Sequence, residues 1–185
     1  MKKIMVGICA FLVATALTGC GFWDEQVQEF RAAVRPEYEK TTDARELLDK
    51  ILQQIADSNP TLVLVDGILV DDDLGLPHYE VLDISVLDHF DQDDIVAGYV
   101  VRPVITVENP KLLMVVEAAD KEAAVRVKAA MEQVKSDQYQ EFAKTEIWAR
   151  YLIDSNELNR QGNFLIYATW NDPADLVKVF QRHVQ

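Results

Sequence analysis

The stretch LLMVVEAADKEAAVRVKAAMEQ, residues 112–133, decides the fold. Residues 111–118, KLLMVVEA, are rich in Val, Leu and Met, which is typical of a β-strand. Asp120 then stands where a helix N-cap belongs. Apolar residues follow at i, i+3, i+7 and i+10, namely Ala124, Val127, Met131 and Val134. This spacing predicts a helix from Asp120 to about Phe142 that packs on a sheet.

The segments before this stretch indicate its partner strand. Residues 97–108, AGYVVRPVITVE, are rich in β-branched side chains, and Asn109–Pro110 supplies a turn. Pro103 cannot donate to a strand ladder, so we expect this strand to lie at a sheet edge or to carry a bulge there. Residues 83–90, DISVLDHF, predict a short helix capped by Asp83.

The segments after the stretch repeat the same pattern. Residues 147–158, IWARYLIDSNEL, and residues 163–170, NFLIYATW, are two strand candidates. Asp172–Pro173 opens a last helix, with Asp172 at the cap and Pro173 at the first position. Two successive β-β-α units predict an α+β two-layer sandwich, a four-stranded antiparallel sheet with helices on one face. Trp148 and Trp170 are expected to serve its core or its rim.

An amphipathic helix precedes these units. In residues 43–58, Asp43 and Glu46 take the capping-box positions, and Asn59–Pro60 ends the helix. Residues 61–70, TLVLVDGILV, then predict a strand or a tight hairpin. Residues 43–185 therefore form a single predicted domain.

The N-terminus predicts export. After Lys2 and Lys3, residues 4–17 carry no charge, and at 1.5 Å per residue this run spans about 21 Å, less than the roughly 30 Å of a bilayer core. Residues 1–19 are thus typical of a cleaved signal peptide. The sequence Leu-Thr-Gly-Cys at residues 17–20 resembles the lipobox of bacterial lipoproteins. That resemblance implies cleavage before Cys20 and a diacylglycerol on its thiol, with residues 20–42 as the lipidated N-terminus and tether. An ordinary cleaved signal followed by a free cysteine is the alternative.

Cysteine usage and charge exclude several classes of function. Cys9 lies inside the predicted signal peptide, so lipidation of Cys20 leaves no thiol for a disulfide, a thiolate metal site or a nucleophile. Removing residues 1–19 takes away Lys2 and Lys3 but no acid, so the formal charge moves from −13 to −15. Nucleic acid is excluded as a partner by this charge, and we expect contact with the lipid bilayer to come from the acyl chains.

Residues 51–101 contain no Lys or Arg. The acids of interest within them are Asp71, Asp72, Asp73, Asp91, Asp93 and Asp94. Such a field can bind Ca²⁺, which takes six to eight oxygen ligands, although the EF-hand spacing is absent. The other interpretation is a solvated acidic face with helix N-caps.

His78 and His89 lie in the same region. The sequence contains no nucleophile elbow, His-Glu-x-x-His pair or P-loop, so we expect no enzyme activity and assign no catalytic residue. A hydrolase acting on wall polymer through two carboxylates is a weaker alternative.

Three segments, HYEVLDISVLDHFD (78–91), residues 112–133 and GNFLIYATWNDPADLVKVF (162–180), resemble a family of uncharacterised Gram-positive lipoproteins that is defined as a domain of unknown function. The resemblance covers about residues 79–183, and members of that family tend to begin with a lipobox. It implies this fold and an extracytoplasmic, membrane-anchored location, and it carries over no binding residue. Our functional expectation is a non-catalytic envelope lipoprotein that docks a protein or ligand on the uncovered sheet face or at the Pro103 edge. A Ca²⁺-binding lipoprotein is the alternative.

Overall fold

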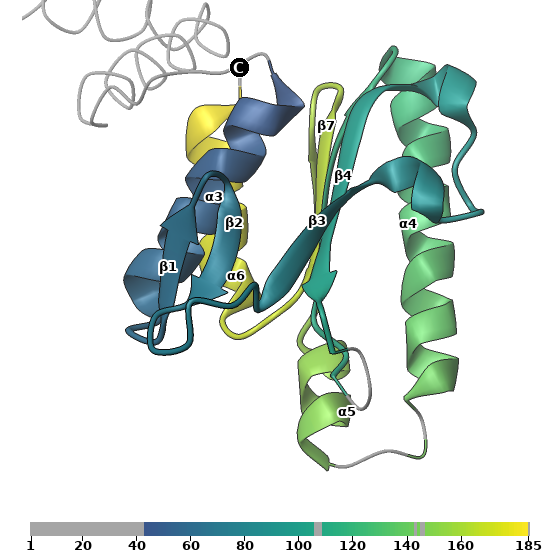
Figure 1. Cartoon of the computed structure of the whole chain (residues 1–185). Coiled ribbons are helices and arrows are strands. Elements are labelled where there is room, and N and C mark those ends of the chain that lie inside the picture. The colour runs from purple at the N-terminus through teal and green to yellow at the C-terminus, as the bar shows by residue number, and fades with distance from the viewer. Residues whose placement is uncertain (1–42, 106–108, 143, 145–146, 185) are drawn as a thin grey trace, which may run out of the picture. The chain divides into compact units, whose positions relative to one another are not determined.

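A five-stranded antiparallel sheet forms the centre of the described chain (Figure 1). The computed structural model describes residues 43–105, 109–142, 144 and 147–184. Across the sheet the strands are β3 (Tyr79–Asp83), β4 (Ile95–Pro103), β5 (Leu112–Ala118), β7 (Phe164–Thr169) and β6 (Glu157–Gln161). The fold is therefore α+β, but with five strands in the sheet, so the predicted count of four is wrong. Among the described residues, no helix combines the length and the apolar character that a membrane span requires.

Helices cover both faces of this sheet (Figure 1). On one face lie α3 (Ala44–Ser58) and α6 (Pro173–His183), which pack on Val115 and Ile166. The other face carries α4 (Lys121–Glu141). The predicted two-layer sandwich with helices on one face is wrong, because successive residues of the central strands are apolar on both sides, so each face requires a cover.

Helix α4 was predicted correctly, and its contacts fix it at two points. The Asp120 carboxylate accepts hydrogen bonds from the backbone N–H groups of Glu122 and Ala123 and so begins the helix. Near the other end, Gln138 is buried. Its side-chain oxygen accepts hydrogen bonds from the Tyr167 hydroxyl at 2.7 Å and the Thr169 hydroxyl at 2.9 Å.

The N-terminal helix was also predicted correctly, and of the two alternatives for residues 61–70 the structure shows the hairpin. The Asp43 side chain caps α3 by accepting from the N–H of Arg45 at 2.6 Å. Strands β1 (Leu62–Val65) and β2 (Ile68–Asp71) pair as a separate two-stranded sheet. Asp66 and Gly67 between them both have positive φ, 50° and 76°, which is the geometry of a type I′ turn and explains the Asp-Gly pair.

Two segments take a different structure from the one predicted. Residues 147–158 divide into helix α5 (Ile147–Asp154) and strand β6, since the buried residues Ala149, Leu152 and Ile153 have helical spacing. Between residues 83 and 90 there is only a 3₁₀ turn, Ile84–Val86, which Asp83 caps as predicted. The sequence did not predict strand β3, which precedes that turn.

Two local expectations are also corrected. Strand β4, which contains Pro103, lies inside the sheet between β3 and β5, and its irregularity falls between Ile95 and Ala97. Pro103 is the last residue of that strand, so its missing N–H interrupts no ladder within it. Asp172 precedes α6 in a left-handed conformation, φ 51°, and its side chain makes no capping hydrogen bond.

Candidate functional site

A cleft of about 470 Å³ lies beside helix α5. It is lined by Lys111, Trp148, Tyr151, Leu152, Ser155, Trp170, Asn171, Asp172 and Pro173. These residues come from the start of β5, from α5 and from the segment that joins β7 to α6. The volume falls within the range of about 300–1,000 Å³ that small-molecule sites occupy, and a mostly apolar lining with a few polar groups is typical of them.

Helix α5 is apolar on two sides. Ala149, Leu152 and Ile153 face the interior and are buried. On the other side, Ile147 is 88 % exposed, Trp148 44 % and Tyr151 71 %. Scattered single apolar side chains on a surface need no explanation, but a large aromatic pair beside a cleft marks a surface that can hold an apolar group.

Lys111 reaches into this cleft from the start of β5. Its ammonium donates a hydrogen bond to the Tyr79 hydroxyl at 3.2 Å and lies 5.4 Å from the centre of the Trp170 ring. The Tyr79 and Trp170 rings stand 4.7 Å apart. Burial lowers the pKa of Lys111 and raises the pKa of Tyr79 to about 12. A cation is thus held against aromatic faces, and none of the described carboxylates forms an ion pair with it.

The rim of the cleft contains the strained residue Asp172. A positive φ is uncommon for a residue other than glycine, although Asp adopts it more readily than most, and it persists where the surrounding structure imposes it. This conformation turns the chain sharply from β7 into α6 and places Asn171 and Asp172 beside the aromatic side chains.

Lys111 also lines a second hollow of about 340 Å³ between β4, β5 and α4. The two other basic side chains there lie against carboxylates. His89 lies 2.7 Å from the Asp137 carboxylate, and Arg102 lies 2.6 Å from the Glu80 carboxylate. Of the basic side chains that line the second hollow, only Lys111 has no acidic partner among the described residues.

The first group of acids predicted as a calcium site lies in the turn after β2. Asp71 ends that strand, and its carboxylate accepts hydrogen bonds from the backbone N–H groups of Asp73 at 3.1 Å and Leu74 at 2.8 Å. Asp72 and Asp73 are exposed. The carboxylate of Asp71 therefore organises a turn.

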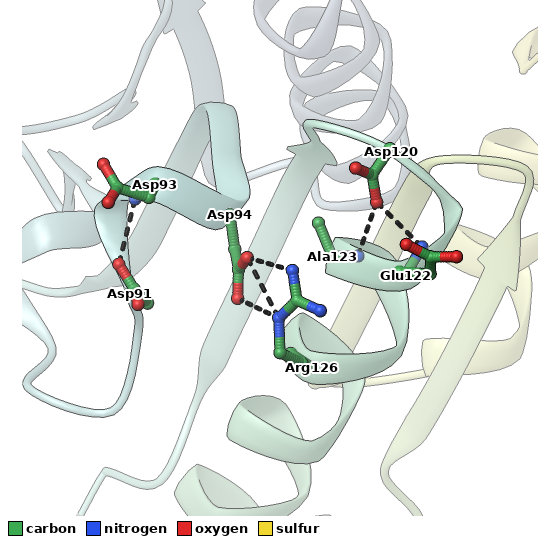
Figure 2. A network of polar contacts seen from close by, with 7 residues as sticks. All are labelled: Asp91, Asp93, Asp94, Asp120, Glu122, Ala123 and Arg126. Atoms are coloured by element: carbon green, nitrogen blue, oxygen red, sulfur yellow. Dashed lines mark hydrogen bonds and ion pairs between the residues drawn. The ribbon is translucent and has the colours of Figure 1, made fainter.

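Figure 2 shows the second acidic group, which lies before β4. Asp94 forms a two-pronged ion pair with Arg126 of α4, with contacts of 2.6 and 2.8 Å, and the hydrogen bond from Arg126 lowers the pKa of that carboxyl. Asp91 accepts from the N–H of Asp93 at 3.0 Å, and the Asp93 carboxylate points away from Asp94. Within the described ranges, no three His, Cys, Asp or Glu side chains are arranged to hold a metal ion. The Ca²⁺ site stays a prediction.

Cys20, the predicted lipidation site, lies outside the described residues. His78 packs at 5.0 Å on the Tyr79 ring. The sequence placed Trp148 and Trp170 in the core or at its rim, and the structure shows Trp170 buried and Trp148 at the rim. It missed Lys111, whose only signal was a single cation between Pro110 and a strand that begins with five apolar residues.

Comparisons of this chain with models of protein families, with curated proteins and with solved structures find no match.

Proposed function

We propose that this protein is an extracytoplasmic lipoprotein, anchored to the outer face of the cell membrane through acylated Cys20, and that it is a non-catalytic binding module of the cell envelope. The resemblance of residues 17–20 to a lipobox supports the anchor. The α5 cleft supports the binding role. We propose it in place of the surfaces expected from the sequence, because helices cover both sheet faces and Pro103 is not at an edge.

The observation that carries the binding role is the exposure of Trp148 and Tyr151 at the rim of a cleft whose base includes buried Trp170. Aromatic side chains give large contact areas at a low cost in conformational entropy, and they are enriched where proteins bind their partners. Exposure of these side chains in the unbound state leaves apolar area that a ligand can cover.

The position of the cleft within the domain agrees with this role. Helix α3 begins and α6 ends at one end of the sheet, and α5 lies at the other end (Figure 1). The first described residue, Asp43, therefore lies at the opposite end of the sheet from α5, so the chain that leads to the proposed anchor does not leave the domain at the cleft.

The anchor is tested with Cys20→Ser in the native host, with membrane fractionation and intact-mass analysis. We expect the variant as unprocessed precursor or as soluble protein, whereas the natural protein should begin at residue 20 and carry acyl chains. Recovery of Cys20→Ser in the membrane fraction at the normal mature mass would contradict lipid attachment.

The cleft is tested in the anchored protein with a photo-crosslinking amino acid at Tyr151. Val125 on α4 is a matched control, because it is also apolar and exposed (58 %) but does not line the cleft. We expect an adduct at position 151 that is absent at position 125 and is lost when Trp148→Ala is added. Equal labelling at both positions would remove the binding role of the cleft.

A further inference from the structure

We propose that the α5 cleft takes a small organic anion, a molecule with a carboxylate or sulfonate group joined to a planar apolar body, and that Lys111 binds the anionic group. This inference rests on the proposed binding role of the same cleft and names the chemical class of its ligand.

The apolar half of the ligand follows from the lining. Trp148, Tyr151 and Leu152 come from α5, and Trp170 and Pro173 come from the segment around the start of α6. The cleft volume of about 470 Å³ suits a molecule of one or two rings. A planar body between aromatic side chains gains dispersion contacts and edge or face packing.

The charge of the ligand follows from the contacts of Lys111. A lysine ammonium has three N–H donors. The contacts of Lys111 among the described residues use one of them, toward the Tyr79 hydroxyl, and the rest of its surroundings are the Tyr79 and Trp170 rings at 5.9 and 5.4 Å. A half-buried charge is screened little by solvent, so an anion that supplies the remaining acceptors gains a charge-assisted hydrogen bond.

The acidic surroundings do not cancel this preference. Asp172 lines the same cleft, but it is exposed and forms no ion pair with Lys111. Water and salt screen an exposed carboxylate well, whereas Lys111 is held against apolar rings. The partly buried cation therefore acts more strongly on a bound group than the solvated acid does.

Two dyes of similar shape separate the two halves of the proposal. Anilinonaphthalene sulfonate is anionic, and N-phenylnaphthylamine has the same aromatic body without the sulfonate. We expect Lys111→Met to lower the affinity for the anionic dye by about ten-fold or more, because one hydrogen bond between charged groups is lost. The uncharged dye should change by less than about two-fold, and Lys111→Arg should keep most of the affinity for the anion.

Two further variants serve as controls. Lys128→Met removes a cation from the exposed face of α4, where it pairs with Glu132, and should leave both dyes unaffected. Trp148→Ala should weaken the binding of both dyes. If Trp148→Ala changes the affinity for neither dye, the cleft is not a binding site and the proposed function fails together with this inference. If Trp148→Ala weakens the binding of both dyes but Lys111→Met lowers the two affinities equally, only the preference for an anion is overturned.

A measurement on the natural protein avoids any folding defect in the Lys111 variants. Phenylpropionate and phenylpropionamide differ in one charged group, and each is titrated against bound N-phenylnaphthylamine. We expect the carboxylate to displace the dye at about a ten-fold lower concentration than the amide. Displacement at equal concentrations would overturn the proposal.

Discussion

Helices α3 and α5 both carry many apolar side chains, but α3 buries nearly all of its own, whereas α5 buries those on one side only. Leu47, Leu48 and Ile51 of α3 have no exposed surface, whereas Ile147 and Tyr151 of α5 are largely exposed. Helix α3 is covered because α6, from the far end of the chain, packs beside it on the sheet. The difference shows that an apolar helix face indicates that a partner is needed, and that the structure is required to tell an internal partner from an external one.

The largest effect on stability is expected from Ile51→Ala, in the layer that α3 and α6 form on the sheet. Truncating a fully buried side chain in a close-packed core removes apolar contacts and leaves a cavity, which costs about 2–5 kcal/mol of unfolding free energy. Denaturant titration measures this cost, with Val125→Ala as a control on an exposed apolar site. A loss below about 1 kcal/mol would show that the α3 layer is no better packed than the α5 end.

Two buried tyrosines should make the free energy of unfolding fall as pH rises in the alkaline range. Burial raises the pKa of Tyr79 and of Tyr167 to about 12 from the ordinary value of 10.0. The folded state then holds protons that the unfolded state releases above pH 10, so their stabilisation is complete below pH 10 and is lost as pH rises through 12. We expect each tyrosine to contribute on the order of 1–3 kcal/mol of this loss.

Tyr167→Phe tests that dependence in unfolding titrations between about pH 9 and pH 11. The variant should be less stable at neutral pH, since it loses the hydrogen bond to Gln138. Between these two pH values, the unfolding free energy of the variant should nevertheless fall by less than that of the natural protein. An unchanged alkaline loss would contradict the burial effect.

Gly98→Ala tests how tightly the sheet is packed on its α4 side. A Cβ at this position would lie 2.5 Å from the Cγ2 of Ile84, which is buried. Such overpacking should cost about 1–3 kcal/mol, measured by denaturant titration. Unchanged stability would mean that the 3₁₀ turn that carries Ile84 moves to accommodate the added methyl group, and that this part of the fold is packed less tightly than the α3 layer.

The smallest effect on stability is expected from Tyr151→Ser, on the exposed side of α5. The side chain is 71 % exposed, so the unfolding free energy should change by no more than about 0.5 kcal/mol. Binding of N-phenylnaphthylamine should weaken all the same, as a fluorescence titration measures. A large loss of stability would place Tyr151 in the core and remove the contrast between α3 and α5.

Local signals predicted the parts of the fold that local interactions decide. Asp43 and Asp120 cap their helices as the sequence indicated, and Asp66–Gly67 forms its tight turn. Residues 147–158 were misjudged because a short apolar run fits a strand and a helix equally well, and only packing on Ala149 and Ile153 decides between them. The second helical layer was missed because it joins two segments more than a hundred residues apart.

The site was harder to predict than the fold. The clustering of the acids in the sequence favoured a calcium site, but in the structure Asp94 pairs with Arg126 and Asp71 organises a turn. The cleft is built from three separate segments, which contribute Lys111, four residues between 148 and 155, and residues 170–173. No spacing rule connects such residues, since the sheet alone brings them together.

The two polar attachments of α4 have a mechanical consequence. Its buried face is otherwise apolar, with Ala123, Ala124 and Val127 among the residues that it buries, and apolar contacts have no preferred direction. The Arg126 ion pair and the Gln138 hydrogen bonds are directional, so they determine where the helix lies along its own axis. These two polar contacts therefore give α4 a fixed register on the sheet.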